Sequence, residues 1–149
     1  MRGLSFTVGD ELFAVDVTLV QKVARKLAIT PVPSAPDEVI GIANLKGRVV
    51  TVLSLCRILG DGQNCDAEQY VNTIVFKSGL GSEDQMGLAV EKPGNLIDID
   101  FGDIKSPPVT ASTQGNFCIS GVAEADEVFY RIIDIESIRK KFIPGSDTV

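Results

Sequence analysis

Short β-branched segments separated by turn residues fill most of the chain, and this feature constrains the fold more than any other. Apolar and polar residues alternate around Leu4, Phe6 and Val8 before a turn at Gly9-Asp10, which predicts a β-hairpin. Many short strands at such a spacing predict an all-β sandwich or barrel. Further strands are expected at residues 39–55 (as a pair), 71–76, 86–90, 96–99, 117–122 and 128–133.

Other segments depart from this strand pattern. Residues 17–29 suit either a helical stripe or a strand, and their β-branched content favours a short turn near residues 17–19 followed by a strand. Residues 56–59, followed by Gly60, predict a short helix. Residues 135–142 place isoleucine and phenylalanine side chains on one helical face, which predicts a C-terminal helix.

The charge balance excludes one class of partner. The chain has 14 Lys and Arg residues against 20 Asp and Glu residues, a formal net charge of -6. Nucleic-acid-binding domains normally concentrate Lys and Arg on one face, so we expect no nucleic-acid partner. No stretch approaches the roughly 20 apolar residues that span a bilayer, and the first residues show no apolar signal region. We therefore expect a cytoplasmic protein without direct membrane insertion.

The residues that usually carry catalysis are scarce. Histidine, the side chain most used as a base near neutral pH and the commonest metal ligand, is absent. Cys56, Cys65 and Cys118 show no Cys-x-x-Cys spacing, which indicates neither a disulfide framework nor a zinc site, so we expect all of them to be reduced. Cys118 lies in a strand context, which favours a core position. We expect no catalytic residues, no metal site and no cofactor.

An acidic cluster at Asp98, Asp100 and Asp103 leaves one alternative from another class. Hard cations such as Mg²⁺ and Ca²⁺ prefer carboxylate oxygens as ligands. The segment lacks the glycine and the distal glutamate of an EF-hand loop, so a solvated face is the preferred interpretation. A small metal-dependent hydrolase remains the alternative function, and turnover by the protein alone would indicate it.

The most specific motif lies at residues 39–55. This segment reads VIGIANLKGRVVTVLSL and resembles the central signature of the CheW-like domain family, V-x-G-x-x-N-L-R-G-x-x-x-P-V-x-D-L. Residues 15–21 resemble the family's I-D-I and V-Q-E-I motifs, and residues 86–91 and 121–135 look like the two later family blocks. The resemblance therefore covers nearly the whole chain.

The resemblance implies both a fold and a function. It implies two SH3-like five-stranded β-barrels packed side by side, with short helices that include a C-terminal one, in a single CheW-like domain of residues 1–149. It also implies a non-enzymatic adaptor between the cytoplasmic tip of a methyl-accepting chemoreceptor and the regulatory domain of the histidine kinase CheA. Such a protein is cytoplasmic and is recruited to membrane receptor arrays.

The resemblance also implies an interface at particular positions. Val20 aligns with an apolar position involved in kinase and receptor coupling. Gly41 and Asn44 align with motif positions beside the same surface. Lys22 and Lys46 occupy the positions of a family glutamate and a family arginine, which can form an ion pair bordering that surface. We expect these residues to form the protein interface.

Structural interpretations stay open at some of these positions. Asn44 and Gly47 suit a tight turn at residues 45–48, in which Gly47 takes a positive φ at little cost. A strand valine such as Val20 is as often a core residue as an interface residue. Both interpretations are compatible with the same sequence.

The chain departs from the family signature at Lys22, Lys46, Thr51 and Ser54, where the family has Glu, Arg, Pro and Asp. Two lysines cannot form the family's ion pair, and lysine lacks the planar fork of arginine. We therefore expect partners with acidic patches facing Lys22 and Lys46. A CheW-like adaptor or competitor in a different array or a surface-motility pathway is the open alternative.

Overall fold

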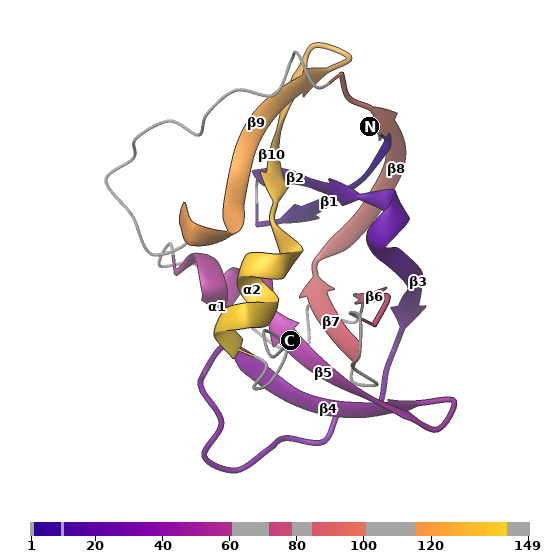
Figure 1. Ribbon diagram of the computed structural model, residues 1–149, viewed down its shortest axis with the longest axis vertical. Helices are drawn as coiled ribbons and strands as arrows, with labels where there is room; N and C mark the ends of the chain where they lie inside the picture. The colour runs from indigo at the N-terminus through magenta and orange to yellow at the C-terminus, as the bar shows by residue number, and fades with distance from the viewer. Residues whose placement is uncertain (1, 10, 61–71, 79–84, 101–115, 143–149) are drawn as a thin grey trace.

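The computed structural model describes residues 2–9, 11–60, 72–78, 85–100 and 116–142, and Figure 1 shows their arrangement. The elements in chain order are strands β1 (Arg2–Val8) and β2 (Glu11–Asp16), the 3-10 turn η1 (Val17–Leu19), strands β3 (Val20–Arg25), β4 (Val39–Leu45) and β5 (Arg48–Ser54), helix α1 (Leu55–Leu59), strands β6 (Asn72–Phe76), β7 (Gln85–Val90) and β8 (Lys92–Asp98), the 3-10 turn η4 (Asn116–Cys118), strands β9 (Ile119–Ala125) and β10 (Val128–Ile133), and helix α2 (Ile135–Phe142).

The strands form two sheets of five strands each. Sheet A has the order β8-β1-β2-β10-β9 and sheet B has the order β3-β6-β7-β5-β4. The chain begins in sheet A, crosses through η1 into sheet B, and returns to sheet A at β8 (Figure 1). The expected all-β architecture of two five-stranded units with short helices, including a C-terminal helix, is confirmed.

One apolar core joins the two sheets. Alternate residues of β1 and β2, among them Phe6 and Phe13, are fully buried and belong to the same cluster as residues of β5, β6 and β7. The rings of Phe6 and Phe13 stack with their centroids 5.8 Å apart. A second, smaller cluster lies within sheet A and includes Ala14 and Ile132, which neighbour residues of the larger cluster along β2 and β10. Strands β1 and β2 of sheet A are therefore buried on both faces over most of their length.

The ambiguous segment after β2 forms a turn and then a strand, as expected. The Asp16 carboxylate accepts hydrogen bonds from the Thr18 backbone N–H at 3.0 Å and the Thr18 hydroxyl at 2.8 Å. These bonds satisfy donors that would otherwise be left free at the start of η1. From Val20 the backbone is extended and pairs antiparallel with β6.

Helix α1 begins with a serine cap and ends at a glycine. The Ser54 hydroxyl accepts a hydrogen bond from the Arg57 N–H at 3.3 Å, and Gly60 ends the helix with φ of 64°. The expected short helix closed by Gly60 is confirmed. Serine and aspartate are both favoured N-cap residues, so Ser54 keeps the capping chemistry that the aspartate in the family signature can supply.

The cysteines differ from the expectation in one respect. Cys56 is disulfide-bonded, so the expectation that all three cysteines are reduced is wrong for this residue. The absence of a Cys-x-x-Cys motif argues against zinc ligation but does not exclude pairs that the fold brings together. Cys118 is a buried thiol, and burial raises the pKa of this thiol to about 11. The Cys118 thiol is therefore protonated at neutral pH, as a core residue would be. Cys65 lies outside the described residues.

No helix of the described residues, α1 and α2 included, is long and apolar enough to span a bilayer.

The Ser54 cap predicts a measurable contribution to stability. Ser54→Ala should lower the free energy of unfolding by about 1 kcal/mol, because it removes the acceptor for the Arg57 N–H. Urea unfolding followed by circular dichroism measures the change. Ser120→Ala is the control, since Ser120 lies in strand β9 and caps no helix. An equal effect of the two substitutions would contradict the capping role.

Candidate functional site

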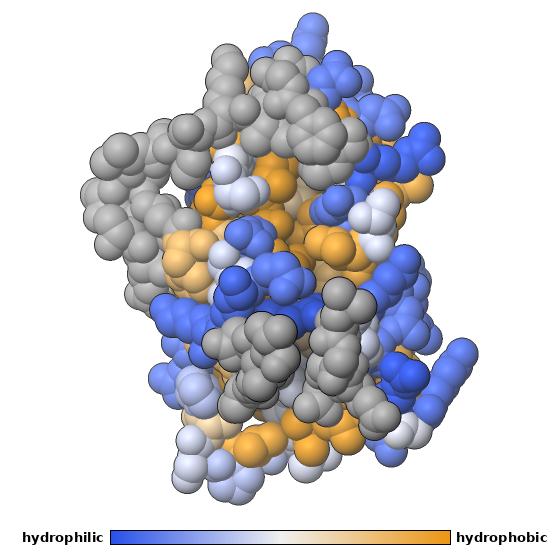
Figure 2. All heavy atoms as spheres, in the orientation of Figure 1, coloured by the Kyte–Doolittle hydropathy of each residue, from blue (hydrophilic) through white to orange (hydrophobic). Residues whose placement is uncertain are grey.

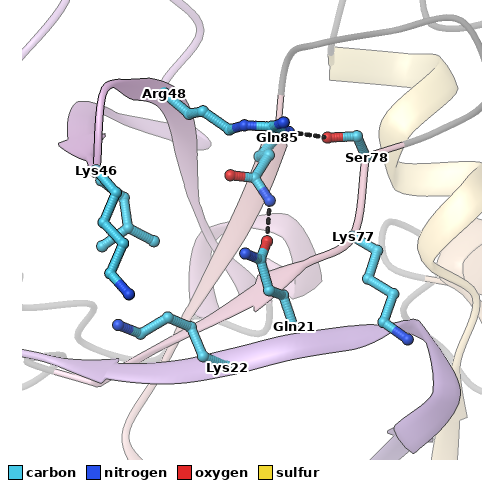
Figure 3. A pocket seen from close by; sticks show the side chains of 8 residues that line it. Gln21, Lys22, Lys46, Arg48, Lys77, Ser78 and Gln85 are labelled. Atoms are coloured by element: carbon cyan, nitrogen blue, oxygen red, sulfur yellow. Dashed lines mark hydrogen bonds between the residues drawn. The ribbon is translucent and has the colours of Figure 1, made fainter.

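A basic pocket of about 440 Å³ opens on sheet B. It lies where the start of β3, the β4–β5 turn, the residues after β6 and the start of β7 come together (Figure 3). Four cationic side chains line it and no carboxylate of the described residues does. The lining consists of Gln21, Lys22, Leu45, Lys46, Arg48, Lys77, Ser78 and Gln85.

The β4–β5 turn carries two of these cations. Lys46 and Gly47 have φ of 52° and 83°, the combination of a type I′ hairpin turn. The Asn44 Oδ1 accepts a hydrogen bond from the Gly47 N–H at 3.0 Å and so holds the turn closed. A positive φ costs a lysine about 1 kcal/mol, whereas Gly47 adopts it freely, as expected. Asn44 therefore positions both Lys46 and Arg48.

The floor of the pocket is a pair of amide side chains. Gln85 is buried at the start of β7, and its Nε2 donates to the Gln21 Oε1 and to the Phe76 carbonyl, the latter at 3.4 Å. A buried amide is stable only when its polar atoms find partners. These bonds fix the Gln85 side chain and tie β3 to β7 beneath the cations.

The far edge of the pocket is held by helix α2 and turn η1. The Arg139 Nη2 of α2 donates to the Lys77 carbonyl at 3.1 Å, and the Lys77 N–H donates to the Leu19 carbonyl at 2.9 Å. The Arg48 Nη1 donates to the Ser78 hydroxyl at 3.4 Å. The Lys77-Ser78 segment therefore has backbone and side-chain partners from three other parts of the chain.

Lys22 and Lys46 face each other in the pocket, and no carboxylate of the described residues lines it to neutralise them. Figure 3 shows the side chains of Lys22 and Lys46 pointing toward each other, while the ammonium of Lys77 points away. The ion pairs found among the described residues join other arginines to carboxylates and include none of the pocket's cations. Like charges at short range repel each other, so this part of the surface attracts anions.

An exposed apolar surface adjoins the basic turn. Ile42 and Val49 are large exposed apolar residues of β4 and β5, and Val49 pairs directly with Asn44 across the hairpin. Because alternate residues of a strand share a face, Ile42, Asn44 and Val49 lie on the same solvent face of the hairpin. Figure 2 shows apolar side chains at the lower edge of the view, where β4 lies in Figure 1.

The structure brings together only part of the predicted interface. Lys22 and Lys46 line one pocket, with Asn44 behind the turn. Val20 is half-buried and packs against the main core. Gly41 is buried, and a Cβ at this position would lie 2.2 Å from the Thr30 carbonyl oxygen. Gly41 therefore permits the crossing of the chain at Thr30, and the part of these residues in partner binding stays a prediction.

Other pocket residues were not found by sequence reasoning. Arg48 lies within the recognised motif at residues 39–55, and its position after Gly47 could have identified it. Gln21, Lys77, Ser78 and Gln85 carry no local signal, because the order of strands in sheet B brings them together. A motif search along the chain does not detect such a cluster.

The acidic cluster considered as a metal site is only partly described. The Asp98 carboxylate lies 3.5 Å from Arg2 in an exposed ion pair, Asp100 is exposed, and Asp103 lies outside the described residues. In the described part of the chain, no group of three or more His, Cys, Asp or Glu side chains is placed to hold a metal ion.

The close approach at Gly41 predicts a large effect of a single methyl group. Gly41→Ala should lower the free energy of unfolding by about 2 kcal/mol, because the Cβ meets backbone atoms that cannot move aside cheaply. Gly3→Ala is the matched control, since its Cβ would meet its nearest atoms only at 3.4 Å. Denaturant unfolding of both variants measures the difference. A Gly41→Ala protein of wild-type stability would show that the crossing is not tight.

The comparisons with known proteins agree on one family. The CheW-like domain matches residues 2–141. The chemotaxis protein CheW of Treponema pallidum is 25% identical over 138 residues, which cover 91% of this chain and 79% of that protein. The chemotaxis protein CheW of Helicobacter pylori is 28% identical over 145 residues, which cover 95% of this chain and 82% of that protein.

A solved structure shares the fold. The crystal structure of the scaffolding protein TtCheW from Thermoanaerobacter tengcongensis matches with a TM-score of 0.76 and 28% identity, covering 89% of this chain and 87% of that one. The match extends over both sheets, so the similarity concerns the whole architecture and not one motif. The chain therefore belongs to the CheW-like domain family of chemotaxis adaptor proteins.

Proposed function

We propose that this protein couples the cytoplasmic tip of a methyl-accepting chemoreceptor to the regulatory domain of the histidine kinase CheA. It acts through protein contacts and catalyses no reaction of its own, and these contacts recruit it from the cytoplasm to membrane receptor arrays. The observation that carries the proposal is the CheW-like domain match over residues 2–141. The name of the solved relative, a scaffolding protein, supports the same role.

The shared core supports one working unit across residues 1–149, a single CheW-like domain with two intertwined barrel subdomains. Phe6 and Phe13 of sheet A are buried in the same cluster as Phe76 of sheet B. Separating the sheets would expose these rings to water, at a cost of roughly 25 cal/mol for each Å² of apolar surface. An adaptor that presents surfaces on both sheets needs this rigid connection.

The proposed interface combines an apolar face with a basic rim. Ile42 and Val49 supply exposed apolar area, and Lys22 and Lys46 supply charge beside it. Protein interfaces commonly have apolar anchors inside a polar border. Of the remaining predicted residues, Gly41 and Asn44 shape the β4–β5 hairpin, and Val20 packs against the core next to Gln21.

The lysine pair indicates acidic partners. Where the family can form a Glu–Arg ion pair, this chain presents two cations that need negative charge from outside. The same observation favours a second candidate, a CheW-like adaptor or competitor that serves a different array or a surface-motility pathway. Purified protein added to CheA and receptor membranes should change kinase activity under the first proposal. Unchanged activity there, with binding to other receptors, would favour the second.

Reversing the lysine charges should weaken coupling. Lys22→Glu with Lys46→Glu should lower the affinity for the receptor tip or the CheA regulatory domain by roughly tenfold at low ionic strength, and the loss should shrink as salt screens the charges. Titration calorimetry with each isolated partner at two salt concentrations measures this effect.

The matched control is Lys26→Glu with Lys92→Glu, which changes the net charge equally outside the basic pocket. Lys26 has φ of 53° and Lys46 has φ of 52°, so each double variant replaces one lysine that has a positive φ. If both double variants bind like the wild type, the lysine pair is not part of the interface. Turnover of a substrate by the protein alone would instead support an enzyme.

A further inference from the structure

Among the described residues, the lining of the basic pocket offers far more hydrogen-bond donors than acceptors. Lysine ammonium and arginine guanidinium groups donate and cannot accept. The Ser78 hydroxyl already accepts from Arg48, so its own proton is available for donation. The Gln21 Oε1 is occupied by Gln85, which leaves the Gln21 Nε2 as a donor. The Gln85 Oε1 is the main acceptor among the described lining side chains, so a ligand with only acceptor atoms fits this pocket.

The positive charge that lines the pocket is more than one carboxylate can neutralise. Lys22 and Lys46 point toward each other, and the Arg48 guanidinium reaches past the amide pair to the Ser78 hydroxyl (Figure 3). Lys77 points away and contributes little. Three positive charges lining one pocket are balanced better by an anion with two negative charges than by a single carboxylate, because each charge left unmatched repels its neighbours.

The backbone holds one of these cations in a costly conformation. Lys46 has φ of 52°, which residues other than glycine, asparagine and aspartate rarely adopt. The Asn44–Gly47 hydrogen bond of 3.0 Å keeps it there and directs its side chain into the pocket. A cation held in place before binding loses less conformational freedom when an anion arrives.

We propose that the basic pocket binds a small anion bearing a phosphoryl group, held between Lys22, Lys46 and Arg48. A phosphoryl group carries up to two negative charges and presents only acceptor oxygens, which suits lysine point charges and the fork of Arg48. The volume of about 440 Å³ falls in the range of small-molecule sites. The Ser78 hydroxyl and the Gln21 Nε2 complete the donor set.

This binding does not depend on the adaptor role, because the assay contains no partner protein. Inorganic pyrophosphate titrated into the full chain by calorimetry at constant ionic strength should give saturable binding. In NMR spectra the backbone amides of Ser78 and Gln85 should shift, which localises the ligand without any substitution. The absence of saturable binding, or shifts elsewhere only, would overturn the proposal.

Substitutions separate a built site from general charge attraction. Lys22→Gln with Lys46→Gln should weaken pyrophosphate binding by roughly tenfold or more, since charge-assisted hydrogen bonds are lost. Lys26→Gln with Lys92→Gln removes the same charge outside the basic pocket and should keep the affinity within about twofold. Equal losses in both double variants would show nonspecific attraction and reject the proposal.

Comparison anions test the chemical class. Citrate, a carboxylate of similar charge, should bind at least about tenfold more weakly than pyrophosphate. Citrate binding as tight as that of pyrophosphate would overturn the phosphoryl assignment. A nucleoside diphosphate tests whether the pocket recognises more than the phosphoryl groups. An affinity equal to that of pyrophosphate assigns the site to the phosphoryl groups alone, and tighter binding assigns it to a nucleotide.

Discussion

The apolar cluster shared by both sheets is the constraint on which the rest of the molecule depends. Phe6 and Phe13 of sheet A stack at 5.8 Å inside a cluster that also contains Leu53, Phe76 and Leu88 of sheet B. Because the sheets bury the same surface, neither can shift without exposing apolar area to water. The same burial holds sheet B in place, and the basic pocket lies in this sheet at the starts of β3 and β7, the β4–β5 turn and the residues after β6.

The pocket concentrates positive charge on a protein whose formal net charge is -6. The excess of acidic residues therefore does not describe the local potential at sheet B. Buried Gln85 fixes the floor, Asn44 fixes the turn, and Arg139 holds the backbone at Lys77. These supports come from different strands and from α2, so they tie the backbone around the charged side chains to the rest of the fold. The proposed partner contact and the proposed phosphoryl site use the same chemistry, attraction of an anion by fixed cations.

Much of the fold could be predicted from the sequence because the relevant signals are local. The all-β architecture, the turn after β2, the short helix before Gly60 and the C-terminal helix follow from alternation, capping and turn residues. Ser54 shows how a departure from the family signature can keep the same physical role, since it caps α1. The disulfide at Cys56 was missed, because spacing along the chain does not report which cysteines the fold brings together.

The sequence alone determined the family, through the motif at residues 39–55, and identified Lys22 and Lys46 as departures from it. Only the tertiary structure decided that these lysines face each other, and that Gly41 lies buried beneath Thr30. The physical reason is the order of strands in sheet B. That order sets β3 and the β4–β5 turn around the start of β7, through pairings that join distant segments of the chain.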